Sequence, residues 1–206
     1  DPYSSYYDAK VVRDFVAFTQ KLGFSPILLP FKPNGKAMHI KGFLARFSKT
    51  AKTQAEFLNR VAKLNVPLVG VDPAIVLSYR DEYKEALGDS RGDFHVLTAH
   101  EWLTNQLESN ALQSAVKNIT KSDRTFEWYL FPHCTESTFM PNSPKEWQHI
   151  FAQFGQTLKV EKVGCCGMAG VFGHEVQNQT MSKDIYDVSW GKKLQGKDPN
   201  HCLATG

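Results

Sequence analysis

No apolar run in this sequence approaches the roughly 18–20 residues that a bilayer-spanning helix requires. The sequence also has no signal peptide, no GxGxxG motif after an expected strand and no P-loop. We therefore expect no transmembrane segment, and we expect that this stretch of chain binds no dinucleotide or nucleotide itself.

Cysteine and excess charge of one sign are scarce as well. Four cysteines among 206 residues are too few for a disulfide framework, which favours a reducing compartment and hence the cytoplasm. The net charge of +3 is too small to indicate a nucleic-acid partner. The hydrophobic fraction of 42% is that of an ordinary globular core.

The apolar periodicity predicts helices and strands in alternation. Strands that alternate with helices at this spacing predict βαβ units with parallel sheet, so the expected fold class is α/β. Asp72 and Pro73 have the sequence of a helix N-cap followed by proline at the first helical position. Helices are expected at residues 9–22, 37–64, 73–87, 99–107, 144–154 and 174–194, and strands at residues 25–31, 67–71, 94–97, 126–131 and 158–163.

The order of these elements repeats after 132 positions. A shift of this size places Gly23 on Gly155 and Gly35 on Gly167, whereas Pro2 falls on Cys134. Both halves then consist of a loop, a helix, a glycine, a strand, a glycine-bearing turn and a helix, with cysteines only in the second. We therefore expect two pseudo-repeated βαβ-type units, with a degenerate first repeat at 1–95, a linker region at 96–125 and a second repeat at 126–206.

All four cysteines lie in three places of the second half. Cys134 follows an aromatic strand, Cys165 and Cys166 adjoin in a glycine-rich loop, and Cys202 comes shortly before residue 206. Thiolates in separate turns predict several loop tips that meet at one metal centre, and soft thiolate ligands select iron–sulfur clusters or zinc. The glycines of the loop can present backbone amide donors to such a centre: Gly164, Gly167, Gly170 and Gly173.

Three histidines lie beside these cysteines, namely His133, His174 and His201. We expect them to support the ligands from the next layer of side chains rather than to bind a metal directly. A helix beginning near His174 would direct its positive N-terminal end toward an anionic cluster. Two other interpretations remain open: a thiol redox switch through a strained vicinal disulfide of Cys165 and Cys166, and a non-catalytic domain whose cysteines bind structural zinc or no metal.

The pattern Cys134, Cys165-Cys166-Gly167-x-x-Gly170 and Cys202 resembles the cysteine-rich CCG domain, known from heterodisulfide reductase and from the iron–sulfur component of glycolate oxidase. The match spans residues 126–206, and residues 1–90 resemble a degenerate first copy. The resemblance implies an iron–sulfur cluster of the 4Fe-4S type bound by the four cysteines, with Gly167 and Gly170 beside it. The family closes each copy with a cysteine pair, so a further cysteine is expected soon after Gly206, where the second repeat would be truncated.

The whole chain resembles the C-terminal region of bacterial FAD-linked oxidases of the D-2-hydroxyglutarate dehydrogenase type. The segments that carry this resemblance are 7–15, 29–36, 70–74 and 202–206. The resemblance implies that FAD and ferredoxin-like domains belong to the same parent chain, and that this module passes electrons from the flavin to an acceptor. The start at Asp1 agrees with the expectation of a fragment that is not active alone. Peripheral attachment to the inner membrane is an alternative to a purely cytoplasmic location.

Overall fold

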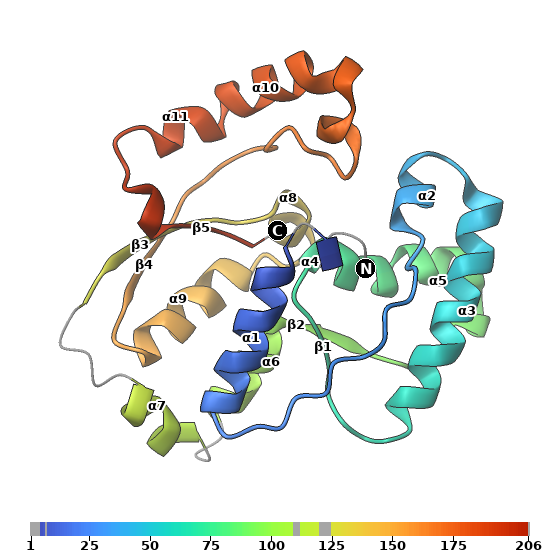
Figure 1. Cartoon of the computed structure of the whole chain (residues 1–206), viewed down its shortest axis with the longest axis horizontal. Coiled ribbons are helices and arrows are strands. Elements are labelled where there is room, and N and C mark those ends of the chain that lie inside the picture. The colour runs from blue at the N-terminus through green and yellow to red at the C-terminus, as the bar shows by residue number, and fades with distance from the viewer. Residues whose placement is uncertain (1–4, 7, 109–111, 120–124, 206) are drawn as a thin grey trace. The chain divides into compact units, whose positions relative to one another are not determined.

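The computed structural model describes residues 5–6, 8–108, 112–119 and 125–205. The chain forms two compact units, Asp1–Asp123 and Arg124–Gly206 (Figure 1). Both combine helices with short parallel sheets, which confirms the expected α/β class. Within the described ranges, no helix is both long and apolar enough to cross a membrane.

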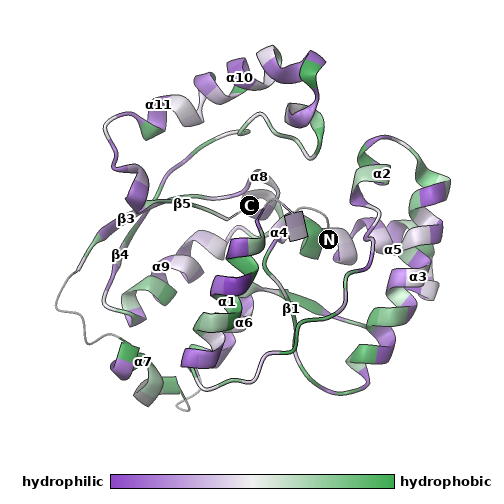
Figure 2. Ribbon diagram, in the orientation of Figure 1, coloured by the Kyte–Doolittle hydropathy of each residue, from purple (hydrophilic) through white to green (hydrophobic). Residues whose placement is uncertain are grey.

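The first unit builds its core between helices and one parallel strand pair. Strands β1 and β2 pair in the register Leu68↔Val96, and β1 is coloured as hydrophobic in Figure 2. The largest buried side chains of the core are Phe47, Tyr83 and Phe94. The elements of this unit are α1 (Ala9–Lys21), α2 (Lys36–Ile40), α3 (Leu44–Ala62), β1 (Leu68–Gly70), α4 (Pro73–Arg80), α5 (Glu82–Leu87), β2 (Val96–Thr98), α6 (Ala99–Glu108) and α7 (Gln113–Ile119).

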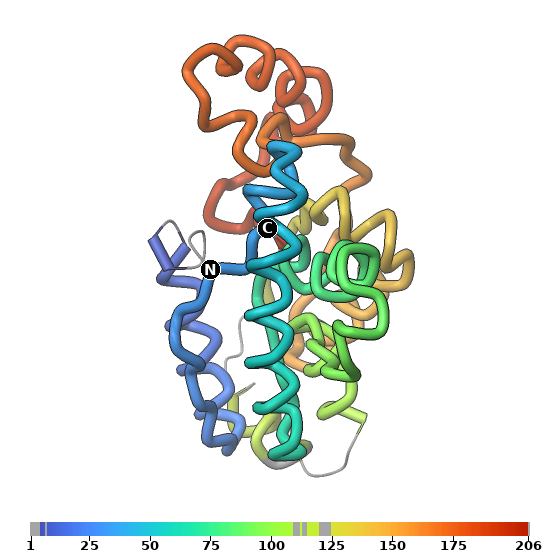
Figure 3. Tube along the Cα trace, turned by 90° about the vertical axis from the view of Figure 1, so that its right-hand side faces the viewer, coloured from blue at the N-terminus to red at the C-terminus, as the bar shows by residue number. Residues whose placement is uncertain are grey.

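The second unit is organised on a parallel sheet with strand order β4-β3-β5 among the described residues. Leu130 and Phe131 of the central strand are buried with Ile150 and Leu158. The loop after β4 lies beside α10 at one end of the unit, as Figures 1 and 3 both show. The elements are β3 (Glu127–Phe131), α8 (Cys134–Phe139), α9 (Ser143–Gln153), β4 (Thr157–Val160), α10 (Gln179–Val188), α11 (Trp190–Leu194) and β5 (Cys202–Ala204).

Several predicted elements differ from the structure. Residues 25–31 form no strand, and Ile27 and Leu28 are exposed rather than buried. The expected helix 37–64 is divided between α2 and α3, because Gly42 adopts a φ of 76° that a helix cannot continue through. The expected helix 174–194 begins only at α10, after two 3-10 turns at Phe172–His174 and Val176–Asn178.

Residues 96–108, the first part of the expected linker region, form β2 and α6, close to the expected strand at 94–97 and helix at 99–107. They belong to the first unit because β2 pairs with β1 and because Trp102 and Leu103 of α6 are buried. The division between the two units falls after Asp123.

A partly buried ion pair joins α4 to α6 in the first unit. Arg80 Nη1 donates to Glu101 Oε1 over 3.0 Å, and the Thr98 backbone N–H donates to Glu101 Oε2 over 2.8 Å. Burial alone raises the pKa of Glu101, but these hydrogen bonds outweigh it and leave the pKa below its usual value of 4.5. Because the folded-state pKa is the lower one, the stabilisation is present above pH 4.5 and is lost as the pH falls through the folded-state pKa.

We expect Glu101→Gln to lower the free energy of unfolding by about 1–3 kcal/mol at neutral pH and by clearly less in acid. Urea unfolding of the protein at pH 7 and pH 3.5 checks this, with Glu56→Gln as the control for an exposed glutamate of α3. An equal loss at both pH values would show that the charge of Glu101 is not what stabilises the fold.

Candidate metal-binding site

Cys134 lies at the start of α8, three residues beyond the end of β3, and its side chain is exposed. The preceding residue, His133, holds this turn in two ways. Its Nδ1 accepts a hydrogen bond from the Thr135 backbone N–H over 3.2 Å, and its own backbone N–H donates to Thr205 Oγ1 over 2.8 Å. Cys134 is therefore fixed beside the carboxyl end of β5.

A buried carboxylate, that of Glu136, holds the helix that carries Cys134 in place. Glu136 of α8 is 1% exposed and accepts hydrogen bonds from Ser143 Oγ and, over 3.0 Å, from Trp147 Nε1. Both partners belong to α9, which packs on β4. The sequence offered no signal for this contact, since a glutamate two residues after a cysteine is typical of an exposed helix face.

The loop that carries Cys165 and Cys166 is tied to α11. Ser189 Oγ accepts a hydrogen bond from the Gly164 backbone N–H over 2.7 Å, and Trp190 Nε1 donates to the Gly164 carbonyl over 3.1 Å. The Trp190 ring also packs against Phe131 at the end of β3, with 5.2 Å between ring centroids. These contacts connect the double-cysteine loop to the carboxyl end of the sheet.

Gly167 is the tightest point of this loop. Its φ of 88° favours glycine, and a Cβ there would lie 2.2 Å from the backbone oxygen of Ser182 in α10. The Gly167 backbone N–H donates to Cys165 Sγ over 3.3 Å, and its carbonyl accepts from Ser182 Oγ over 2.8 Å. An amide aimed at sulfur stabilises a thiolate, as expected for a metal ligand. Gly170 also has a positive φ, of 67°, but is exposed.

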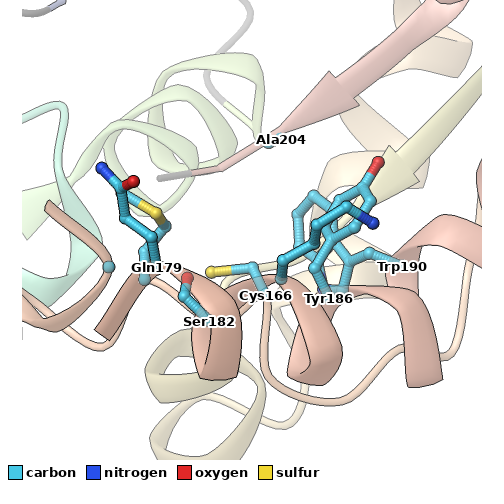
Figure 4. A pocket seen from close by; sticks show the side chains of 9 residues that line it. Cys166, Gln179, Ser182, Tyr186, Trp190 and Ala204 are labelled. Atoms are coloured by element: carbon cyan, nitrogen blue, oxygen red, sulfur yellow. The ribbon is translucent and has the colours of Figure 1, made fainter. Parts of the chain in front are cut away.

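Cys166 faces a pocket of about 440 Å³ between the loop, α10 and the end of β5 (Figure 4). Figure 4 shows its sulfur between the Ser182 side and the Tyr186 and Trp190 side of this pocket. Ala204, the last residue of β5, forms another wall. Cys166 therefore lies at the same carboxyl edge of the sheet from which the chain continues to Cys134.

Cys202 is placed differently. It is the first residue of β5, opposite Tyr129, whereas the carboxyl edge begins at Ala204, roughly 7 Å further along the strand. Its thiol donates to the backbone oxygen of Asp198 over 3.4 Å, and burial raises its pKa, with Lys197 acting in the opposite direction. The structure thus does not bring Cys202 to the edge where the other three cysteines emerge.

The other two histidines beside the cysteines have different surroundings. His201 packs on Phe126 and Trp128, with centroid separations of 5.2 and 5.0 Å, so its ring belongs to an aromatic cluster. His174 is exposed at the end of a 3-10 turn. The helix expected to begin near His174 begins at Gln179 instead, and Gln179 lines the same pocket as Cys166.

The ligand set is only partly assembled. Within the described residues, no three Cys, His, Asp or Glu side chains lie together in a way that could hold a metal ion. All four cysteines are free thiols. Cys134, Cys165 and Cys166 have the donor chemistry of a soft-metal site and come from loops at one sheet edge. Cys202 has the same chemistry but lies at the start of β5.

The chain is similar along its whole length to curated D-2-hydroxyglutarate dehydrogenases. All 206 residues are 81% identical to the Haemophilus influenzae protein, 58% identical to that of Escherichia coli K12 and 39% identical to that of Pseudomonas putida. The chain spans about one fifth of the length of these relatives, namely 20%, 19% and 19%. No family model and no solved structure matches the chain.

Proposed function

We propose that this chain is the cysteine-bearing electron-transfer module of a larger FAD-linked D-2-hydroxyacid dehydrogenase of the D-2-hydroxyglutarate type. All 206 residues of the chain align with such dehydrogenases and cover about one fifth of their length. This similarity supports the proposed identity of the parent enzyme. Placement of Cys134, Cys165 and Cys166 at one carboxyl edge is the observation that carries the electron-transfer role. The flavin and a ferredoxin-like segment would belong to other parts of the parent chain.

Cys134, Cys165 and Cys166 are the proposed ligands of an iron–sulfur cluster of the 4Fe-4S type, in a CCG-type repeat. When bound, such a cluster would store and release one electron at a time. The chain's own contribution is to hold the thiolates. The Gly167 N–H stabilises negative charge on Cys165, and the apolar walls beside Cys166 limit contact with water.

The position of Cys202 changes its proposed role. β5 carries the chain past Ala204 and Thr205 to the edge where the three thiols lie, and His133 already bonds to Thr205 there. A cysteine that follows Gly206 in the full-length protein would therefore be better placed than Cys202 to complete the site. We propose that Cys202 packs in the strand instead.

Metal analysis of the full-length protein, purified without oxygen, tests this proposal. We expect iron and acid-labile sulfide with a redox-active EPR signal, and a loss of about four iron atoms in Cys134→Ser. Cys202→Ser serves as the matched control and should keep its iron. Iron loss in Cys202→Ser equal to that in Cys134→Ser would overturn the ligand assignment.

The same measurement separates the two alternatives. Stoichiometric zinc without sulfide would indicate a structural metal site and would overturn electron transfer by a cluster. A two-electron thiol titration without any metal would indicate a redox switch through Cys165 and Cys166.

A further inference from the structure

The sheet of the first unit is smaller than that of the second. Among the described residues it contains only β1 and β2, so each of these strands has one edge without a partner strand. The second unit instead has a central strand, β3, that pairs with β4 on one side and β5 on the other.

The first unit also exposes an apolar segment at residues 25–31, which form neither helix nor strand. Ile27 is 86% and Leu28 is 72% exposed, and Leu29 and Phe31 are exposed as well. Pro26 and Pro30 lie within the same stretch. Contiguous exposed apolar side chains of this kind mark a surface that another segment covers.

The local geometry of the two units matches at a displacement of 132 residues. Gly23 after α1 and Gly155 after α9 both have positive φ, of 92° and 68°. Each donates its N–H to the carbonyl three residues earlier, over 2.9 and 3.0 Å. The next N–H donates five residues back in both units, from Phe24 to Thr19 and from Gln156 to Phe151. The two helices thus end in the same way.

A second pair of glycines shows the same correspondence. Gly35 and Gly167 have φ values of 82° and 88°. Each is pressed against a helix that comes later in its unit, since an added Cβ would lie 2.9 Å from the Phe47 side chain of α3 and 2.2 Å from Ser182 of α10. Under this displacement β4 falls on residues 25–28, and β5 falls within two residues of β1.

The counterpart of the central strand falls outside residues 1–206. Moving β3 back by 132 positions places it two to six residues before Asp1. We infer that, in the full-length protein, the segment just before Asp1 forms a parallel strand that enters the first unit between residues 25–31 and β1. The relatives of this chain are about five times its length, so a parent chain of similar length could provide the residues of such a strand.

This strand would complete the sheet in the order 25–31, inserted strand, β1, β2. The free edge of β1 supplies unpaired N–H and C=O groups, and Ile27 and Leu28 supply apolar surface to bury on its two faces. The occupant is therefore an apolar strand of the same chain. The inference does not depend on any metal, because it concerns only the unit without cysteines.

The register of the second unit sets the test. Leu130 of β3 lies opposite Val160, so the third residue before Asp1 should lie opposite Leu28. The test variant of the full-length protein carries Leu28→Cys and a second cysteine at that third residue before Asp1. We expect these two cysteines to form a disulfide on mild oxidation, because residues opposite each other on paired strands have Cα atoms within the roughly 4.4–6.8 Å that a disulfide spans. Ile27→Cys is the matched control, since adjacent strand residues point to opposite faces and should cross-link at least about tenfold less.

The cross-linked peptides are identified by mass spectrometry, which separates them from products of the native cysteines. Hydrogen exchange at residues 27–31 of the unmodified full-length protein gives an independent result, and we expect slow exchange. Equal cross-linking at Leu28 and Ile27, or exchange as fast as in an unfolded peptide, would overturn the inference. A disulfide that forms between two molecules would point to a second copy as the occupant and would overturn it too.

Discussion

Cys165→Ser and Cys166→Ser are each expected to slow electron transfer from the reduced flavin to an external acceptor by at least about 100-fold in the full-length dehydrogenase. Reduction of the flavin by the hydroxyacid substrate should remain within about twofold of wild type, because our proposal assigns that half-reaction to another part of the parent chain. A serine hydroxyl remains protonated at neutral pH and is a harder donor than a thiolate, so it binds iron poorly. The two variants thus separate the module from the flavin chemistry.

Stopped-flow absorbance of the flavin measures both half-reactions in the same sample. Cys202→Ser is the control, because its thiol bonds to the Asp198 carbonyl away from the proposed centre. Unimpaired turnover of Cys165→Ser with normal iron content would remove the electron-transfer role from this loop. Slow flavin reduction in all three variants would instead indicate damage to folding.

Gly167→Ala is expected to destabilise the second unit strongly. The left-handed backbone costs an alanine about 1–2 kcal/mol, and the overlap with the Ser182 backbone oxygen adds about 1–3 kcal/mol of strain. That oxygen belongs to the backbone of α10, so it cannot turn aside as a side chain could. We therefore expect a total loss of about 2–5 kcal/mol, together with loss of bound iron.

Gly155→Ala is a matched control for this substitution. Its φ of 68° is also positive, but no heavy atom lies within 4 Å of the added Cβ. We expect Gly155→Ala to lower the free energy of unfolding by about 1–2 kcal/mol, because only the left-handed backbone conformation is strained. Bound iron should be retained. Thermal unfolding and iron content of the full-length protein check both variants. Equal costs for Gly155→Ala and Gly167→Ala would mean that the loop does not need its close approach to α10.

The elements that local pattern specifies most strongly were predicted well. α1 and α9 follow clear apolar periodicity and end at a glycine with positive φ. Asp72 caps α4 as expected, because its carboxylate accepts the Ile75 N–H over 3.1 Å. Gly42 divides one expected helix into α2 and α3, whereas the expected helix 73–87 is divided at Asp81 and the expected helix 174–194 begins only at Gln179.

The spacing of the cysteines does not determine where Cys202 lies in the sheet. A separation of 35 residues after Cys166 allows a strand start or a strand end, and only the pairing of Cys202 with Tyr129 decides between them. The same limit applies to His201, which lies next to a cysteine in sequence but packs on Phe126 and Trp128.

The amino-acid sequence by itself determined that this chain is an α/β protein with parallel strands, and it confines the four thiols to three short stretches of the second half. These features follow from periodicity, capping residues and the positions of the thiols, all of which act within a few neighbouring residues. Only the tertiary structure decided which thiols share an edge, because that depends on strand order and register. It also showed that residues 25–31 have no strand partner among the described residues, since pairing is made between segments far apart in the chain.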